Sequence, residues 1–496
     1  MFNKPWFRIA LIISLGFIVY SFALSSPFKF LDDQVTILEN PLVQQPGHYQ
    51  EIFTQGYFHD HSYYRPLIIL SYKAETFLFG IDAFFFNLDN CILHILNALL
   101  VWILVRLLTG SPTWGFWVGL LFVIHPIHVE AVSNISGRGI LLSATGVLSS
   151  FIMFLLYDQR KKVGFLVASI VFFILGLLCK ESSAVLPGVI FFYLWLNKKP
   201  LWRVGPFAVV ILLYLSWRHH LGMTQMFPYR SIYEHSLGVV TFLNSLFVHL
   251  RLLILPTDLY FDRSQEVFLS FKDVLFMGTV LIWGTVLSLL LVYRKRIPMI
   301  LLFAIGWFFL EMFPVAQVFS SIIVASRSIS TADHFLYLAS IPFFILFVYG
   351  LENLWKLNQQ KKWLSSMVLG VVAMAYLANL LIITIEQNIY SGHEVKTIQE
   401  SLRRQPQNAR LLFAMGIIYT RNRQFKEAEP YFLKAMAANP QDVRYPISLG
   451  QCLCDQGRYQ EGLNIFNAIE NPGNYQDIID TDRKNALLHL MSKPHA

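Results

Sequence analysis

The chain has 496 residues, of which 55% are hydrophobic and only 14% are charged. Soluble proteins carry about 25% charged residues, so this composition excludes an ordinary soluble enzyme and predicts a chain that crosses a membrane several times. The formal net charge of +8 does not indicate nucleic-acid binding, because many basic residues lie in short clusters between apolar runs, as at residues 160–162 and 294–296. Such clusters are topology signals, since basic loops stay in the cytoplasm.

The first apolar run extends from Ile9 to Leu24 and follows Lys4 and Arg8. The residues before Pro27 form a poor cleavage site for a signal peptidase, so we expect an uncleaved first span. The basic residues predict a cytoplasmic N-terminus. The first outer loop is then predicted at residues 27–83.

Ten further apolar runs have the length of a membrane span, about 17–25 residues. They begin near Phe84, Trp114, Gly139, Val163, Ser183, Leu201, Val274, Met299, Leu336 and Trp363. Together with the first run they predict about eleven spans. The stretch from Leu237 to Leu255 is expected to be re-entrant or interfacial, because His249 and Arg251 interrupt it and Pro256 ends it. This odd total predicts a C-terminal tail on the outer side.

The tail, residues 386–496, is polar and contains an internal repeat. The repeated positions are Gly416, Tyr419, Phe425, Ala428, Phe432, Ala435 and Pro440, followed one period later by Gly450, Gly457, Tyr459 and Phe466. This is the 34-residue tetratricopeptide pattern, and it predicts repeats at about 409–442 and 443–476 with a capping helix at 480–491. The predicted fold is therefore an all-α membrane helical bundle, residues 1–385, followed by a tetratricopeptide-repeat domain that contacts a peptide or protein.

Ionisable side chains gather at the predicted outer ends of the spans, whereas the predicted inner loops hold little beyond basic clusters. The outer set contains Asp32, Asp33, Arg65, His125, His128, Glu130, Arg138, Lys180, Glu181, Asp333 and His334. Ionisable groups at membrane depth are costly, so their concentration on one side indicates a functional site.

Several chemistries fit this set. The adjacent Asp32 and Asp33 can supply a general base, hold a divalent cation, or be a solvated pair. The three-residue spacing of His125 and His128 is a weak zinc signal, and a pair of hydrogen-bonded histidines fits it better. Lys180 either pairs with its neighbour Glu181 or directs an ammonium at a phosphate. The chain lacks the Walker, dinucleotide-binding and Gly-x-Ser-x-Gly motifs, which disfavours soluble-nucleotide chemistry.

Eight short motifs occur in an order that resembles a known family. They are Leu31-Asp32-Asp33, Glu39-Asn40-Pro41, Tyr64-Arg65-Pro66-Leu67, Leu93-His94 through Asn97, His125 through Val132, Gly137-Arg138, Lys180-Glu181 and Leu336-Tyr337-Leu338. In this order, with the repeats after them, they resemble the transmembrane and tetratricopeptide-repeat O-mannosyltransferase family, a group of GT-C glycosyltransferases.

The resemblance implies inverting transfer of a hexose from a polyprenyl-phosphate donor to an acceptor hydroxyl outside the cytoplasm. It implies that Asp32 or Asp33 is the base and that the donor phosphate meets Arg138 and Lys180, with Arg65 and His334 as further phosphate ligands. The supporting residues are expected to be His125, His128, Glu130, Glu181 and Asp333. No cofactor is implied with certainty, and a divalent cation at the site is left open.

The implied partners are the lipid-linked donor, membrane lipid, and an acceptor protein or glycan held by the repeats. The short repeat array favours a bacterial relative in the inner membrane. One departure is the pair Asp333-His334, where the family has an acidic residue followed by arginine, and only protonated histidine matches that charge. Two alternatives remain: a lipid-linked oligosaccharide or glycan ligase, and a non-enzymatic membrane-anchored scaffold. The four cysteines form no disulfide framework.

Overall fold

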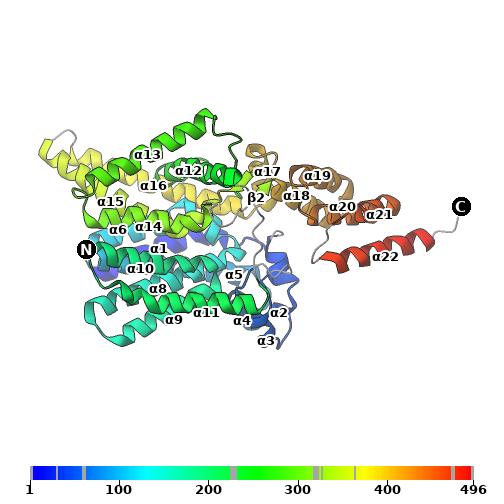
Figure 1. The fold of residues 1–496 in the computed structure, drawn as a ribbon, viewed down its shortest axis with the longest axis horizontal. Coiled ribbons are helices and arrows are strands. Elements are labelled where there is room, and N and C mark those ends of the chain that lie inside the picture. Colours follow the sequence, from blue (N-terminus) through cyan, green and yellow to red (C-terminus); the bar gives the residue numbers. More distant parts are fainter. Residues whose placement is uncertain are drawn as a thin grey trace. The chain divides into compact units, whose positions relative to one another are not determined.

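The computed structural model describes residues 4–29, 32–57, 63–223, 232–316, 323–325, 328–361, 365–470 and 475–492. These residues are mostly helical (Figure 1) and form two compact units. The membrane unit comprises residues 1–259, 270–320 and 333–392, and the repeat unit comprises residues 260–269, 321–332 and 393–496.

The membrane unit is a bundle of helices joined by short turns. Its α-helices are α1 (Pro5–Tyr20), α2 (Pro41–Gln44), α3 (Tyr49–Thr54), α4 (Pro66–Phe79), α5 (Ala83–Thr109), α6 (Pro112–Ile124), α7 (Val129–Val132), α8 (Arg138–Arg160), α9 (Val163–Cys179), α10 (Leu186–Leu196), α11 (Gly205–His220), α12 (Ile232–Ile254), α13 (Val274–Tyr293), α14 (Met299–Met312), α15 (Leu336–Lys361) and α16 (Ser366–Ser391).

Many of these helices are long and apolar enough to cross a membrane, so the chain is a multi-pass membrane protein. Among the described residues, eight helices meet that test, and the bent pair formed by α6 and the segment Pro126–Val132 makes up to nine. Helices α9, α10 and α14 are apolar but shorter. The predicted helical membrane bundle is confirmed, while the count of about eleven spans corresponds to a mixture of full-length and shorter apolar helices.

One predicted segment differs. Helix α12 runs without a break through His249 and Arg251 and is long and apolar enough to span. The two polar residues do not interrupt it, because a helix satisfies its own backbone and His249 is buried against the bundle. The side of the membrane on which the tail lies was derived by counting spans, so it stays a prediction.

Glycines allow close contacts between helices of the bundle. An added Cβ at Gly115 of α6 would lie 2.5 Å from the backbone oxygen of Trp102 in α5. An added Cβ at Gly146 of α8 would lie 2.7 Å from the Cα of Gly176 in α9. Small residues at such crossings are typical of membrane helices, whose association depends on close packing. These contacts hold α5, α6, α8 and α9 together beneath the candidate site.

The repeat unit contains paired antiparallel helices and a small sheet. Its helices are α17 (Glu394–Arg404), α18 (Ala409–Arg421), α19 (Phe425–Ala438), α20 (Arg444–Asp455), α21 (Tyr459–Asn467) and α22 (Gln476–Ser492). Strands β1 (Ser264–Glu266), β2 (Ile323–Ala325) and β3 (Ser328–Ser330) form an antiparallel sheet in the order β1-β3-β2. Helices α18 with α19 and α20 with α21 are paired as the repeat pattern of the C-terminal region predicts.

The two compact units meet in the chain after Gly392, whereas the predicted boundary at residue 386 was placed where the composition turns polar. Helix α16 continues to Ser391, and two segments from the predicted membrane domain belong to the repeat unit. The side chain of Asn408 donates to the Asp262 backbone oxygen at 3.1 Å, and that of Gln405 donates to the Ser264 backbone oxygen at 2.7 Å. These bonds fasten the β1 segment to the start of α18.

Gly416 is expected to be essential for the packing of the first repeat. Its α18 backbone lies against the Phe432 ring of α19, and an added Cβ would be 2.5 Å from a ring carbon. Gly416→Ala should therefore destabilise the repeat unit by about 1–3 kcal/mol, measured by thermal unfolding and limited proteolysis. Gly350→Ala in α15 is the control, because nothing lies within 4 Å of its added Cβ. Equal protease resistance of the two variants would contradict the expectation.

Candidate functional site

A compact turn between α6 and α8 organises the candidate site. Helix α6 ends before Pro126, and residues 125–138, which we call the α7 turn, contain two short 3₁₀ segments around α7. The turn is tight: a Cβ added at Gly137 would lie 2.0 Å from the Ala131 backbone oxygen. It lies at the end of the bundle where α1 and α6 end and α8 begins, which we call the site end.

The acidic pair lies against this turn, and the structure distinguishes its two members. The Asp33 side chain is 1% exposed and accepts backbone N–H groups from Lys29 at 2.8 Å and Ser136 at 3.0 Å. Burial raises the pKa of Asp33 to about 6, although these two N–H groups and the charge of Lys29 lower it. Asp32 is half-buried, and no described residue forms a hydrogen bond or ion pair with its carboxylate. Asp32 is therefore the member that is open to a substrate.

Lys180 lies between α9 and the 3₁₀ segment that precedes α10. It is half-buried, and among the described residues its ammonium has no hydrogen bond or ion pair. The pKa of Lys180 is lowered to about 8, first by burial and then by the charge of Arg65, and the carboxylates of Glu181 and Glu130 only partly offset this. A lysine in this position has a desolvated charge available for an anion.

Glu181 is held by Arg65 rather than by its neighbour Lys180. The Arg65 guanidinium donates from Nε at 3.0 Å and from Nη2 at 2.5 Å to the two carboxylate oxygens of Glu181. The same guanidinium lies over the Tyr63 ring, 4.4 Å from its centroid. A forked arginine–carboxylate pair of this kind is strong and directional. Glu181 therefore pairs with Arg65, and the alternative of a Lys180–Glu181 ion pair does not apply. This arrangement leaves the Lys180 ammonium without a bonded partner among the described residues.

Glu130 and His334 are in contact near Lys180. The Glu130 carboxylate accepts the His334 backbone N–H at 3.1 Å and lies 3.0 Å from its Nδ1. His334 belongs to a 3₁₀ segment, Asp333–Phe335, that begins α15, and Asp333 itself is buried. The His334 side chain is therefore directed at a carboxylate of the α7 turn.

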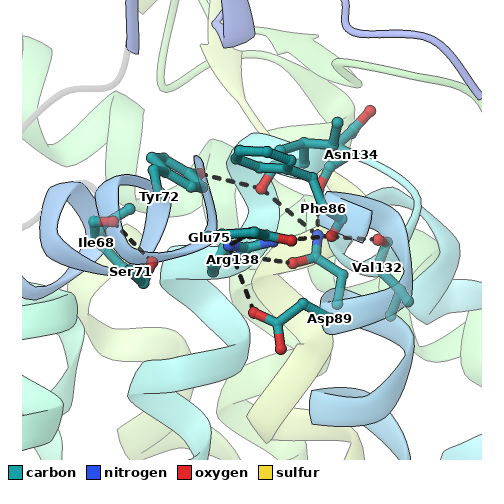
Figure 2. Close-up of polar contacts among 11 residues, drawn as sticks. Ile68, Ser71, Tyr72, Glu75, Phe86, Asp89, Val132, Asn134 and Arg138 are labelled. Carbon is teal, nitrogen blue, oxygen red and sulfur yellow. Dashed lines mark hydrogen bonds and ion pairs between the residues drawn. The ribbon is translucent and has the colours of Figure 1, made fainter. Parts of the chain in front are cut away.

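Arg138 is buried in a polar cluster beneath the turn (Figure 2), where its side chain is 0% exposed. Its Nη1 pairs with Glu75, its Nε donates to Asn90 Oδ1 at 3.1 Å, and its Nη2 donates to the Phe86 backbone oxygen at 2.8 Å. With all three nitrogens engaged and aromatic rings on both sides, this geometry favours a structural role for Arg138 over the predicted phosphate contact.

The two histidines of the α7 turn are also fully buried and fully bonded. His125 accepts from the Ile127 backbone N–H at 3.2 Å and donates to the Leu253 backbone oxygen at 3.2 Å. His128 lies 2.8 Å from the Phe122 backbone oxygen and 3.0 Å from Ser340 Oγ. These contacts fit the hydrogen-bonded reading better than the zinc reading. In the part of the chain that the structure describes, no group of three His, Cys, Asp or Glu side chains can hold a metal ion.

The sequence did not single out Lys29, Glu75 or Asn90, which hold the site together. Lys29 attaches the loop that carries Asp32 and Asp33, which we call the acidic loop, to the α7 turn. Glu75 and Asn90 bind Arg138. Glu75 and Lys73 are charged residues near the middle of α4, and both are nearly fully buried. Two charged residues in the middle of an apolar helix could have indicated buried polar partners from the sequence, because charged side chains are rarely buried without a partner.

Comparison with known proteins agrees with this architecture. A tetratricopeptide-repeat model matches residues 395–443 and 413–475. Protein O-mannosyl-transferase TMTC3 of Mus musculus is 24% identical over 505 residues, which cover 92% of this chain and 53% of that protein. Tmtc3 of Drosophila melanogaster is 22% identical, covering 82% of this chain and 52% of that protein. Human TMTC1 is 34% identical over 155 residues, 29% of this chain and 17% of that protein.

The chain spans about half the length or less of the curated relatives that it matches. Its homologues are thus proteins named as protein O-mannosyl-transferases, as the motifs predicted. A solved structure, ArnT from Cupriavidus metallidurans bound to undecaprenyl phosphate, matches with a TM-score of 0.44 and 15% identity. That match covers 94% of this chain and 80% of the ArnT chain.

Proposed function

We propose that this protein transfers a hexose, mannose by analogy with its relatives' names, from a polyprenyl-phosphate donor to a protein hydroxyl at the outer membrane face. The observation that carries the proposal is the half-buried ammonium of Lys180, which no described residue engages, at the same end of the bundle as the open carboxylate of Asp32. A structural lysine at this depth would be paired, so an unpaired one is best explained by an anionic ligand.

The proposed reaction divides the work between the two groups. Asp32 accepts the proton of the acceptor hydroxyl while the acceptor oxygen attacks the anomeric carbon of the sugar. The bond from that carbon to the phosphate oxygen breaks with inversion, and polyprenyl phosphate leaves. Negative charge grows on the leaving phosphate, where the Lys180 ammonium stabilises it. The Arg65–Glu181 pair adjoins Lys180 and orients it electrostatically.

A direct assay tests the proposal. The purified full-length protein is incubated with synthetic polyprenyl-phosphate mannose and with membrane proteins of a deletion strain, and the products are analysed by mass spectrometry. A hexose that appears on serine or threonine only with wild-type protein supports the proposal. Sugar found only on glycans would indicate the ligase alternative, and no transfer from any lipid-phosphate hexose would contradict both.

Lys180→Met is expected to lower kcat/KM for the donor by about 10²–10³, since one charge-stabilising contact in a catalytic site has that value. Lys162→Met is the matched control, because Lys162 lies at the opposite end of the same helix and is exposed. Both variants should fold, because no ion pair of the described protein is broken. A control and a site variant with equal activity would remove the role of Lys180.

The pKa of Lys180 predicts how transfer activity declines at alkaline pH. With a pKa of about 8, Lys180 loses its charge as the pH rises through 8, so kcat/KM for the donor should fall above that pH. In Lys180→Arg, kcat/KM for the donor should not decline above pH 8, whatever its value at neutral pH, because arginine remains protonated. An alkaline limb that is identical in wild-type and Lys180→Arg protein would assign the titration to another group.

A further inference from the structure

The Lys29 side chain attaches the acidic loop to two other parts of the membrane unit. Its ammonium donates to the Ser133 backbone oxygen at 2.8 Å, to Asn134 Oδ1, and to Ser391 Oγ at 2.7 Å. Ser133 and Asn134 belong to the α7 turn, and Ser391 is the last residue of α16. The three donors of a lysine ammonium are thus directed at three neutral oxygen acceptors.

The same loop has a second attachment four residues further on. The Asp33 carboxylate accepts the backbone N–H of Lys29 with one oxygen and that of Ser136, in the α7 turn, with the other. Lys29 and Asp33 therefore close a short loop on each other, and each is separately bonded to the turn. Asp32 lies between these two attachment points in the chain.

The choice of neutral acceptors for Lys29 matters for Asp32. A lysine paired directly with the Asp32 carboxylate would stabilise its charged form and weaken it as a base. Here three hydrogen bonds of the ammonium go to neutral oxygens, its charge acts on Asp33, and no described residue pairs with Asp32. The positive charge contributes to the loop's attachment without occupying the carboxylate that faces a substrate.

We propose that Lys29 is a positioning residue that holds the acidic loop against the α7 turn and the end of α16, so that the Asp32 carboxylate is fixed opposite the donor. This inference rests on the function proposed above. Lys29 touches neither the donor nor the acceptor, and it acts through the loop. Its loss therefore lowers the rate of the chemical step without weakening donor binding.

The test compares Lys29→Met with Lys180→Met and with Lys272→Met, a control in which an exposed lysine is changed. Lys29→Met should lower kcat about 10- to 100-fold with an unchanged KM for the donor, because small displacements of a reacting group have effects of this size. Ser391→Ala should lower kcat about 2- to 5-fold in the wild type and have no further effect in Lys29→Met, since both changes remove one contact.

Amide hydrogen exchange provides a readout that does not depend on activity. Peptides covering residues 25–40 should exchange faster in Lys29→Met and at the wild-type rate in Lys272→Met. Faster exchange with no measurable transfer by wild-type protein would support the attachment and overturn the proposed function alone. Unchanged exchange, a raised donor KM, or full additivity with Ser391→Ala would overturn the positioning role.

Discussion

Asp32→Asn is expected to lower kcat by about 10²–10⁴, the usual contribution of a general base. Asparagine has nearly the same shape but cannot accept the proton of the acceptor hydroxyl. Because the Asp32 carboxylate has no bond to any described residue, the substitution breaks no contact of its side chain, and the melting temperature should stay near that of the wild type. Single-turnover transfer and thermal unfolding measured on the same preparation check both parts.

Two further variants make this prediction specific. Glu51→Gln removes a partly exposed carboxylate from the same outer loop and should leave turnover unchanged. Asp33→Asn should instead lower stability, because its amide replaces one of the two oxygens that accept N–H groups and turns a donor toward a donor. If Asp32→Asn retained full activity while Asp33→Asn was stable and inactive, the base would be Asp33.

Arg138→Met is expected to destabilise the membrane unit by about 3–5 kcal/mol, the cost of removing one partner from a buried ion pair. The change leaves Glu75 with 7% exposure and no partner on its Arg138 side, and it frees the Asn90 amide oxygen and the Phe86 backbone oxygen. Detergent-solubilised protein should therefore melt at a clearly lower temperature and be produced in lower yield.

Arg160→Met is the matched control, because Arg160 is the exposed last residue of the helix that Arg138 begins. The double variant Arg138→Met with Glu75→Gln should recover part of the lost stability, since it removes the stranded charge. A stable and inactive Arg138→Met protein would restore the phosphate-binding role that the sequence suggested.

The sequence was most informative where a single physical signal repeats. Apolar runs of spanning length and the glycine–aromatic spacing of the repeats identified most of the bundle and both repeats, because each follows from burial alone. Strands β1 and β3 could not be found in this way: each has three residues, and their pairing joins Ser264 to Ser330 across helices α13 and α14. No local pattern indicates so short a strand.

In the candidate site, too, the sequence identified the region but not the pairing of distant residues. The sequence gathered Asp32, Lys180 and His334 in one region, because ionisable residues at membrane depth are rare enough to stand out. It left open whether Lys180 pairs with Glu181, and the partner of Glu181 is Arg65, 116 residues away. The reason is the break between the helices: Lys180 has an extended backbone that ends α9, so neighbouring side chains diverge there. Only tertiary structure decides which distant arginine fills the gap.

The repeat unit is assembled from three separate segments of the chain, and this has a practical consequence for the design of truncations. Stopping the chain after Ser391 would not simply remove a tail, because the β1 segment would lose Gln405 and Asn408, to which it is bonded, and β3 pairs with β1. An inactive truncation would then report orphaned loops, one of which runs directly into His334, and not a need for acceptor capture. Point substitutions on the surface of α20 or α22 are the cleaner means of asking what the repeats contribute.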